Sequence, residues 1–162
     1  MAVAVATSTK IQVATGWTGT APGAPGTQTV SGTLTSGVDV SGLFTAITVN
    51  LAGEQIEWTN FTSGGWKAML VGLKEATLDL SLNAGFAAAS DTDVYFGLGG
   101  TYGFGTTFYI DIMPTNAARG TGNPSTVMQV LNLGYGAAFT VGQLATAPLT
   151  LKPTGLPGRL TA

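Results

Sequence analysis

Apolar and polar residues alternate with a period of two along most of the chain. The clearest case is residues 76–82, where the alternation places apolar and polar side chains on opposite sides of a strand. Residues 44–51 and 106–113 repeat this pattern, and further strands are expected at 9–14, 29–34, 54–61, 126–133 and 144–152. The pattern therefore predicts a mainly β fold, an antiparallel β-sandwich or barrel-like single domain spanning residues 1–162.

One short helix and several long loops should flank the strands. Residues 90–98 have the pattern of a helix: Ser90 is a suitable N-cap, Asp91 and Asp93 suit the positive end of the helix dipole, and Gly97 ends it. The glycines that follow, up to residue 105, are expected to form a turn. Residues 113–123 are expected to form a loop that holds Arg119.

Two other irregular stretches are candidates for contacts between copies. Residues 16–26, with the sequence GWTGTAPGAPG, are too rich in Gly and Pro for a strand interior and predict an arm or loop. Residues 62–76 are expected to be an assembly loop, because their apolar side chains would be unusual on a free surface. The interface candidates in these two stretches are Trp17, Trp66, Met69, Leu70, Val71 and Leu73.

Composition removes most classes of enzyme. The chain has no Cys and no His, which excludes thiolate nucleophiles, Ser-His-Asp triads and zinc sites built on these residues. Only 9% of its residues are charged and the net charge is −2, so a basic nucleic-acid or lipid-binding patch is not expected. No basic signal segment and no run of 18 apolar residues is readable, which favours synthesis in the cytoplasm and no membrane partner.

The remaining candidate chemistry has simpler explanations. The glycine run at 97–105 lacks the spacing of a phosphate-binding loop, so a helix end and a turn are favoured over a nucleotide site. Asp91 and Asp93 are too few for a calcium site. Glu54, Glu57 and Asp79 could supply an acid/base pair but fit the solvated faces of strands better. We therefore expect a protein that is not an enzyme and has no cofactor and no metal.

Several segments resemble a known family. The sequence EWTNFTSGGWKAMLVGLKEATLDLSL at 57–82 and the sequence YIDIMPTNAARGTGNPS at 109–125 are similar to the major tail, or tail tube, proteins of long-tailed phages that infect actinobacteria. The resemblance implies a structural virion protein, made in the host cytoplasm, that self-assembles as hexameric rings stacked into the viral tail tube. Its partners would be copies of itself and other virion tail proteins, with transient passage of DNA during ejection. A capsid decoration protein, or a non-catalytic binding module, remains an alternative.

A tube of this kind would have room for DNA. If six subunits each supply four strands, about 24 strands at roughly 4.8 Å spacing and about 40° tilt enclose a barrel about 48 Å across. Side chains would leave about 35 to 40 Å, which is wider than a duplex of roughly 20 Å. If strands 54–61, 76–82 and 106–113 form the inner sheet, their polar sides face this channel. The lumen candidates are then Glu57, Thr77, Asp79, Ser81 and Asp111, unless some of these strands belong to an outer sheet.

Overall fold

A computed structural model describes residues 9–22, 30–58, 68–84, 95–136, 138, 140, 141, 143, 145–155 and 157–161, with only the backbone at 58 and 68–74. The described part consists mainly of antiparallel strands, as the alternation predicted. The strands are β1 (Lys10–Ala14), β2 (Gly16–Thr18), β3 (Thr33–Thr35), β4 (Val38–Asp39), β5 (Phe44–Trp58), β6 (Ala68–Asn83), β7 (Thr107–Met113), β8 (Ser125–Tyr135), β9 (Thr146–Pro153) and β10 (Gly158–Leu160), with a 3-10 turn η1 (Ser41–Leu43) before β5.

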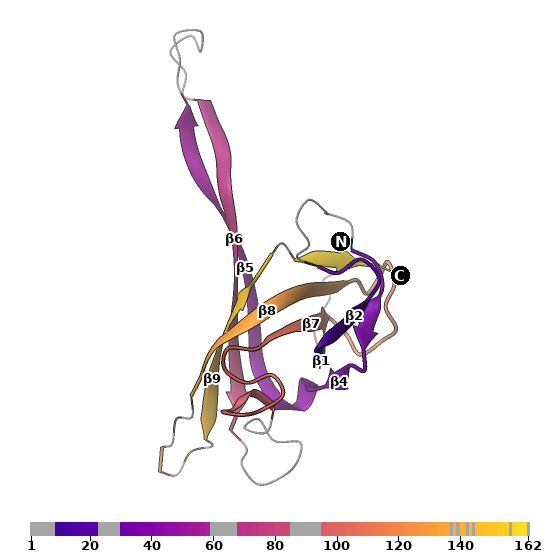
Figure 1. Cartoon of the computed structure of the whole chain (residues 1–162), viewed down its shortest axis with the longest axis vertical. Coiled ribbons are helices and arrows are strands. Elements are labelled where there is room, and N and C mark those ends of the chain that lie inside the picture. Colours follow the sequence, from indigo (N-terminus) through magenta and orange to yellow (C-terminus); the bar gives the residue numbers. More distant parts are fainter. Residues whose placement is uncertain are drawn as a thin grey trace.

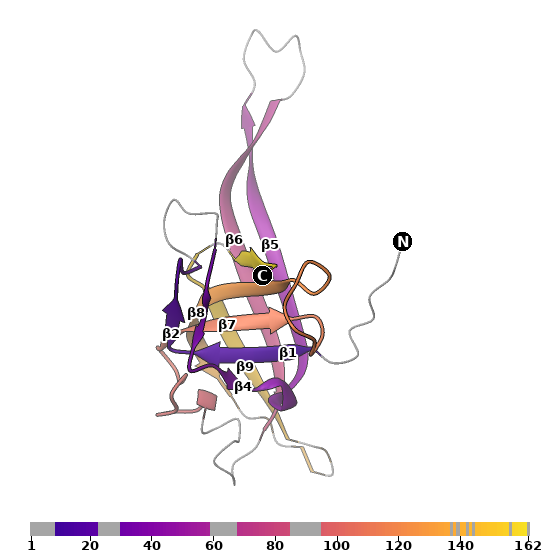
Figure 2. The same ribbon diagram turned by 90° about the vertical axis from the view of Figure 1, so that its right-hand side faces the viewer.

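The main sheet folds into two layers. Its strand order is β4-β1-β7-β8-β9-β6-β5, with β10 paired to β8, while β2 and β3 form a separate hairpin. Strands β1, β7 and the first half of β8 lie across β9, β6 and β5 (Figures 1 and 2). The change of layer occurs within β8, which pairs with β7 through its first half and with β9 through its second half. The arrangement is a sandwich made from one continuous sheet.

The core lies between the two layers and is built from the apolar sides of both. Leu78, Leu80 and Leu82 of β6 are buried, as their alternation predicts. They share one hydrophobic cluster with Phe108 and Ile110 of β7. Every second residue is buried from Ala76 to Leu82 of β6 and from Ala147 to Leu151 of β9, so the intervening residues of these segments are left on the outer surface.

The long hairpin of β5 and β6 differs from the sequence-based expectation. The strands expected at 44–51 and 54–61 are one strand, β5, as far as Trp58. The expectation of a loop at 62–76 is wrong for residues 68–76, which belong to β6 and pair with β5 as far as Ala68↔Trp58. Residues 59–67 lie outside the described residues. The hairpin extends well beyond the two layers (Figure 1), and we call residues 52–58 with 68–75 the arm.

The Gly/Pro-rich stretch is also more regular than predicted. Gly16–Thr18 form β2, which pairs with β3, so the expectation of a loop is wrong for these residues, and residues 23–26 lie outside the description. Strand β3 begins at Thr33 rather than at residue 29. Gly32 has a φ of +111°, and a Cβ there would meet the Thr18 carbonyl oxygen at 1.7 Å. Only glycine fits this close approach.

The expected helix is described only at its end. Tyr95 and Phe96 are helical, whereas residues 90–94 lie outside the description. Residues 97–106 then form a series of turns, as the glycines predicted, with a positive φ at Gly99 and Gly105. Residues 114–123 form the expected loop after β7.

Candidate assembly and channel surfaces

The outer side of β5, β6 and β9 is a continuous polar surface. Cross-strand register aligns Thr48 with Asp79 and Asp79 with Thr150, so these side chains share one side of the sheet. All of them are exposed. We define the polar face by its exposed members Thr48, Asn50, Thr77, Asp79, Ser81, Pro148 and Thr150. The lumen candidates Thr77, Asp79 and Ser81 thus lie together on one open face.

The polar face carries little net charge. Asn50 Nδ2 donates a hydrogen bond of 3.3 Å to Asp79 Oδ2 across the strand pair. Next to the face, Lys152 Nζ lies 3.0 Å from Glu75 Oε1, and both side chains are more than half exposed. Such an exposed pair contributes about 0–1 kcal/mol, but it cancels two charges. Apart from Pro148, the face is therefore made of hydroxyls and an amide, with Asp79 as its acidic group.

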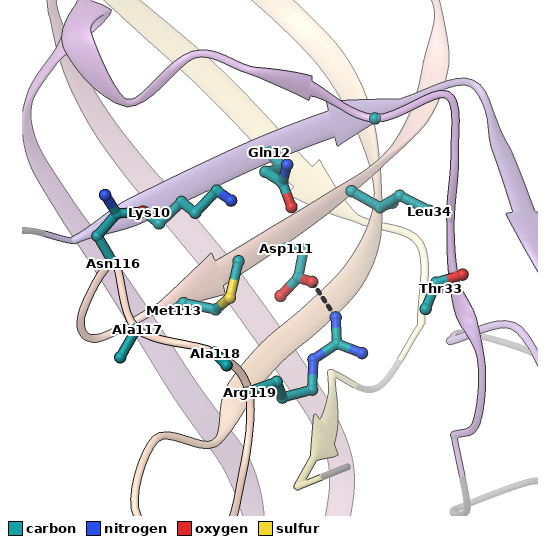
Figure 3. A pocket seen from close by; sticks show the side chains of 11 residues that line it. Lys10, Gln12, Thr33, Leu34, Asp111, Met113, Asn116, Ala117, Ala118 and Arg119 are labelled. Carbon is teal, nitrogen blue, oxygen red and sulfur yellow. Dashed lines mark hydrogen bonds and ion pairs between the residues drawn. The ribbon is translucent and has the colours of Figure 1, made fainter.

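Asp111 does not lie on an open surface, so the prediction that its side chain faces a channel is wrong. Its side chain is 1% exposed, and its Oδ2 accepts a hydrogen bond of 2.5 Å from Arg119 Nη2. The same guanidinium donates through Nη1 to the Gly32 carbonyl oxygen at 3.3 Å. The loop after β7 folds back over the outer side of its own strand and brings Arg119 onto the carboxylate (Figure 3).

Arg119 is the residue that the sequence-based analysis did not assign. It joins β7, the loop at 114–123 and the β2–β3 hairpin through one side chain. The signal for it was a single arginine in a loop eight residues after an aspartate on a strand. A hollow of about 340 Å³ lies beside this pair, lined also by Lys10, Gln12 and Asn116. Within the described residues, no group of three or more Asp, Glu, His or Cys side chains could hold a metal ion.

The interface candidates have three different outcomes. Trp17 is half-buried, and it donates from Nε1 to the Ser31 carbonyl oxygen at 3.0 Å while its ring packs 5.8 Å from that of Tyr109. It therefore stabilises the hairpin of its own chain. Trp66 lies outside the described residues. The backbone of Met69, Leu70, Val71 and Leu73 lies in strand β6, in the arm.

The arm presents apolar side chains that the sequence-based analysis did not single out. Leu51, just before the arm, is 68% exposed and lies on the same side of β5 as Val49, which is partly buried against the core. Ile56 is 47% exposed and lies at an alternate position with Asn50, on the side of the polar face. Glu57 is exposed near the end of β5. Strand β5 thus exposes apolar side chains on both of its sides, which a strand standing in water would not require.

Comparison with known proteins shows the fold. No family model matches the sequence, and no curated protein matches it. A chain in the virion of a native gene transfer agent particle matches with a TM-score of 0.54 and 14% identity over 77% of this chain and 89% of that one. A chain in the tail of an empty gene transfer agent particle, solved with C6 symmetry, matches with a TM-score of 0.56 and 14% identity over 79% and 88%.

The third comparison is with the SPP1 tail tube. It matches with a TM-score of 0.54 and 9% identity over 96% of this chain and 77% of that one. Each of these structures is an assembly named as a virion, a tail or a tail tube. This chain is similar to their subunits in fold, and at these identities the similarity concerns the fold alone.

Proposed function

We propose that this chain is the structural subunit of a phage tail tube, in which copies form stacked rings that conduct DNA during ejection. The observation that carries the proposal is the polar face: an open, weakly charged sheet surface backed by the core of the subunit. The similarity in fold to subunits of tail and tail tube structures supports it. The protein would then be made in the host cytoplasm and reside in the virion tail, next to other tail proteins.

The sheet supports lateral closure into a ring. Strand β5 ends the strand order, so among the described residues its outer edge pairs with no other strand. A strand of 15 residues with an open edge favours pairing with another chain. Strands β5, β6, β9 and the second half of β8 give four strands per copy. Six copies would supply about 24 strands and a barrel about 48 Å across, as estimated above.

The polar face supports passage of DNA without retention. Binding to a duplex gains free energy when cationic side chains release the counterions of its phosphates. The face has Lys152 at its margin, already paired with Glu75, and Asp79 near its middle. Hydroxyls and amides then allow the duplex to slide, while Asp79 repels phosphate within about 8 to 10 Å at physiological salt.

The first experiment is electron microscopy of the purified chain. Tail tube function predicts rings or hollow tubes with a stain-filled channel about 35 to 40 Å wide, from the strand arithmetic. Monomers or trimers that attach to capsid shells would instead identify a decoration protein and contradict the proposal. A monomer that binds an oligosaccharide would contradict it in favour of a binding module.

The second experiment tests which face lines the channel. The double variant Thr77→Lys with Asp79→Lys adds cations to the polar face, and we expect assembled tubes to retain duplex DNA inside, less strongly as salt rises. The matched control is Thr107→Lys, because Thr107 is exposed on the outer side of β7 in the other layer. Two results would contradict a polar face that lines the channel. In one, tubes of the control retain as much DNA as tubes of the double variant; in the other, the double variant holds DNA on the outer surface of the tube.

A further inference from the structure

The hollow beside Asp111 and Arg119 has a floor made by two paired strands. Register aligns Gln12 of β1 with Asp111 of β7, and Lys10 with Met113, so these four side chains share one side of the sheet. The residues between them on both strands face the core, so the hollow opens on the opposite side of the sandwich from the polar face. Strand β3 and the loop after β7 form its walls. Its volume of about 340 Å³ suits a small ligand.

The loop after β7 is held in place by one side chain. Asn123 is 8% exposed, and its Nδ2 donates to three carbonyl oxygens of the loop, those of Thr115 at 3.3 Å, Ala117 at 3.0 Å and Ala118 at 3.4 Å. Its Oδ1 accepts a hydrogen bond of 3.2 Å from the Thr115 N–H. Gly120 and Asn123 also exchange backbone hydrogen bonds of 3.0 and 3.3 Å. This wall of the hollow is therefore fixed before a ligand arrives, which lowers the entropic cost of binding.

The ion pair in the hollow has unused hydrogen-bonding capacity on both partners. Asp111 Oδ2 and Arg119 Nη2 bind each other, but Asp111 Oδ1 and Arg119 Nε are buried and have no hydrogen-bond partner among the described residues. Figure 3 shows the carboxylate and the guanidinium side by side at one end of the hollow. Leaving a buried charged group short of a hydrogen bond is unfavourable. Oδ1 accepts and Nε donates, so the pair favours a ligand that carries a donor and an acceptor close together.

An ammonium group lies on the same floor. Lys10 makes no ion pair within the described residues, and its side chain extends along β1 toward Gln12 (Figure 3). Lys10 and Arg119 give the lining two positive charges and Asp111 gives one negative charge, which leaves a net charge of +1. This excess of positive charge favours a ligand with an anionic group.

Met113 covers the approach to the buried atoms. Its side chain is 6% exposed, and Figure 3 shows its thioether end beside the Asp111 carboxylate, on the side of Lys10. A methionine side chain is unbranched, has three rotatable bonds and adapts readily to its surroundings. A small ligand can therefore reach Asp111 Oδ1 and Arg119 Nε when Met113 turns aside, without movement of the backbone.

We propose that the hollow binds a small carboxylate that has a hydrogen-bond donor on the carbon next to its carboxyl group, the class of the α-hydroxy acids and α-amino acids. The ligand carboxylate accepts hydrogen bonds from Lys10 Nζ and Arg119 Nε, and the ligand hydroxyl or ammonium group donates to Asp111 Oδ1. Both buried atoms of the ion pair then have a partner. The anionic group of the ligand lies at the two cations and its donor lies at the one anion, so the two sets of charges are complementary.

The test titrates the chain with glycolate and with glycine, followed by calorimetry and by NMR chemical shifts. The two probes share the carboxylate and differ in the donor, which is a hydroxyl group in glycolate and an ammonium group in glycine. We expect at least one of them to bind saturably with a Kd of about 1 mM, an affinity within the limit for ligands this small. Propionate is the matched probe, because it has a methyl group in place of the donor. It should bind at least about tenfold more weakly, since it leaves Asp111 Oδ1 unpaired.

A pair of lysine variants locates the binding. Lys10→Met removes the ammonium group and keeps a side chain of similar length, and the Kd of the bound probe should rise at least about tenfold. Lys10 is only partly buried, so folding should be kept, which circular dichroism and thermal melting check. Lys152→Met is the matched control, because Lys152 lies in the other layer at the margin of the polar face, and it should change the Kd by less than about twofold.

Three results would overturn the inference. Neither probe saturates the chain at about 10 mM, which would mean that the hollow holds only water; propionate binds as tightly as the better of the two probes; or Lys152→Met weakens binding as much as Lys10→Met does. The hollow and the polar face lie on opposite sides of the sandwich, so the binding measurement on the unassembled chain does not depend on tube formation. Tubes without binding would leave the tail tube proposal intact and end this inference, whereas binding without tubes would do the reverse.

Discussion

The pair of Asp111 and Arg119 gives the sharpest test of how the subunit is held together. Truncation in Arg119→Ala leaves a carboxylate that is 1% exposed without its guanidinium. Breaking a buried ion pair by removing one partner costs about 3–5 kcal/mol, mainly because the remaining charge is not compensated. Arg119 is 16% exposed, so some water reaches the pair and the lower figure, about 3 kcal/mol, is expected.

The assay is urea or thermal unfolding of the unassembled chain. A loss of about 3 kcal/mol corresponds to a fall in Tm of about 6 to 12 °C for a chain of this size. The control Arg159→Ala removes an exposed arginine on β10 and should change the free energy of unfolding by no more than about 0.5 kcal/mol. Replacing both partners, with Asp111→Leu and Arg119→Met, should restore most of the loss, because no buried charge remains.

Two results would refute this reasoning. A loss below about 1 kcal/mol in Arg119→Ala would mean that water replaces the guanidinium at Asp111, so the loop at 114–123 does not seal the carboxylate. If the double variant is less stable than Arg119→Ala, removing the buried charge restores no stability, and the two sites show no favourable coupling. The pair would then act through the shape that it gives the loop rather than through charge.

Three further predictions concern the supports of the fold. Asn132→Ala should lower the free energy of unfolding by about 2–3 kcal/mol in urea titrations, because the carbonyl oxygens of Phe96 and Tyr102 lose a buried donor, and hydrogen exchange in the turns at 97–106 should increase. Trp17→Ala should lower stability by about 1–2 kcal/mol through loss of its contacts to Ser31 and Tyr109, while tubes still form, and normal stability with failed assembly would make Trp17 an interface residue after all. Burial raises the pKa of Asp39, but two hydrogen bonds from Ser41 and the charge of Lys10 together lower it below its usual value. The lowered pKa stabilises the fold above about pH 4 and this contribution disappears as pH falls through the folded pKa, so Asp39→Asn should reduce the loss of Tm on acidification, and an unchanged pH profile would contradict it.

The alternation predicted which side of a strand is apolar, but not what covers the other side. Along β6 the buried Leu78, Leu80 and Leu82 and the exposed residues between them follow the pattern residue by residue. On β7 the same reasoning assigned Asp111 to an open side, and it is buried there by a loop that folds back from beyond the strand. Periodicity is a local property of the chain, whereas the position of Arg119 depends on how the loop returns.

The extent of the arm was hidden for a related reason. In residues 66–76, WKAMLVGLKEA, the alternation breaks, because apolar residues follow one another and Gly72 interrupts them. Strand β6 nevertheless continues, since β5 offers a pairing edge as far as Trp58. One extra residue of β6 between the positions paired with Gly53 and Gln55 changes the register there. Beyond such a bulge, the residues of β6 face the opposite sides from those that a continuous alternation would give. A pattern with a period of two therefore no longer identifies the strand.

The distribution of exposed apolar residues connects these local features to assembly. Among the side chains that the structure describes, the large exposed hydrophobic residues are Leu51, Ile56, Leu98, Phe104, Leu133 and Val141, and none of them lies on residues 75–83 of β6 or on β9. A chain with 9% charged residues has little charge with which to prevent association at random. It instead keeps residues 75–83 of β6 and strand β9 free of large exposed apolar side chains and carries such side chains on β5, on the turns at 97–106, at Leu133 of β8 and at Val141. That distribution is expected if the edge strand β5 and the turns meet other copies while the middle of the polar face stays in contact with water.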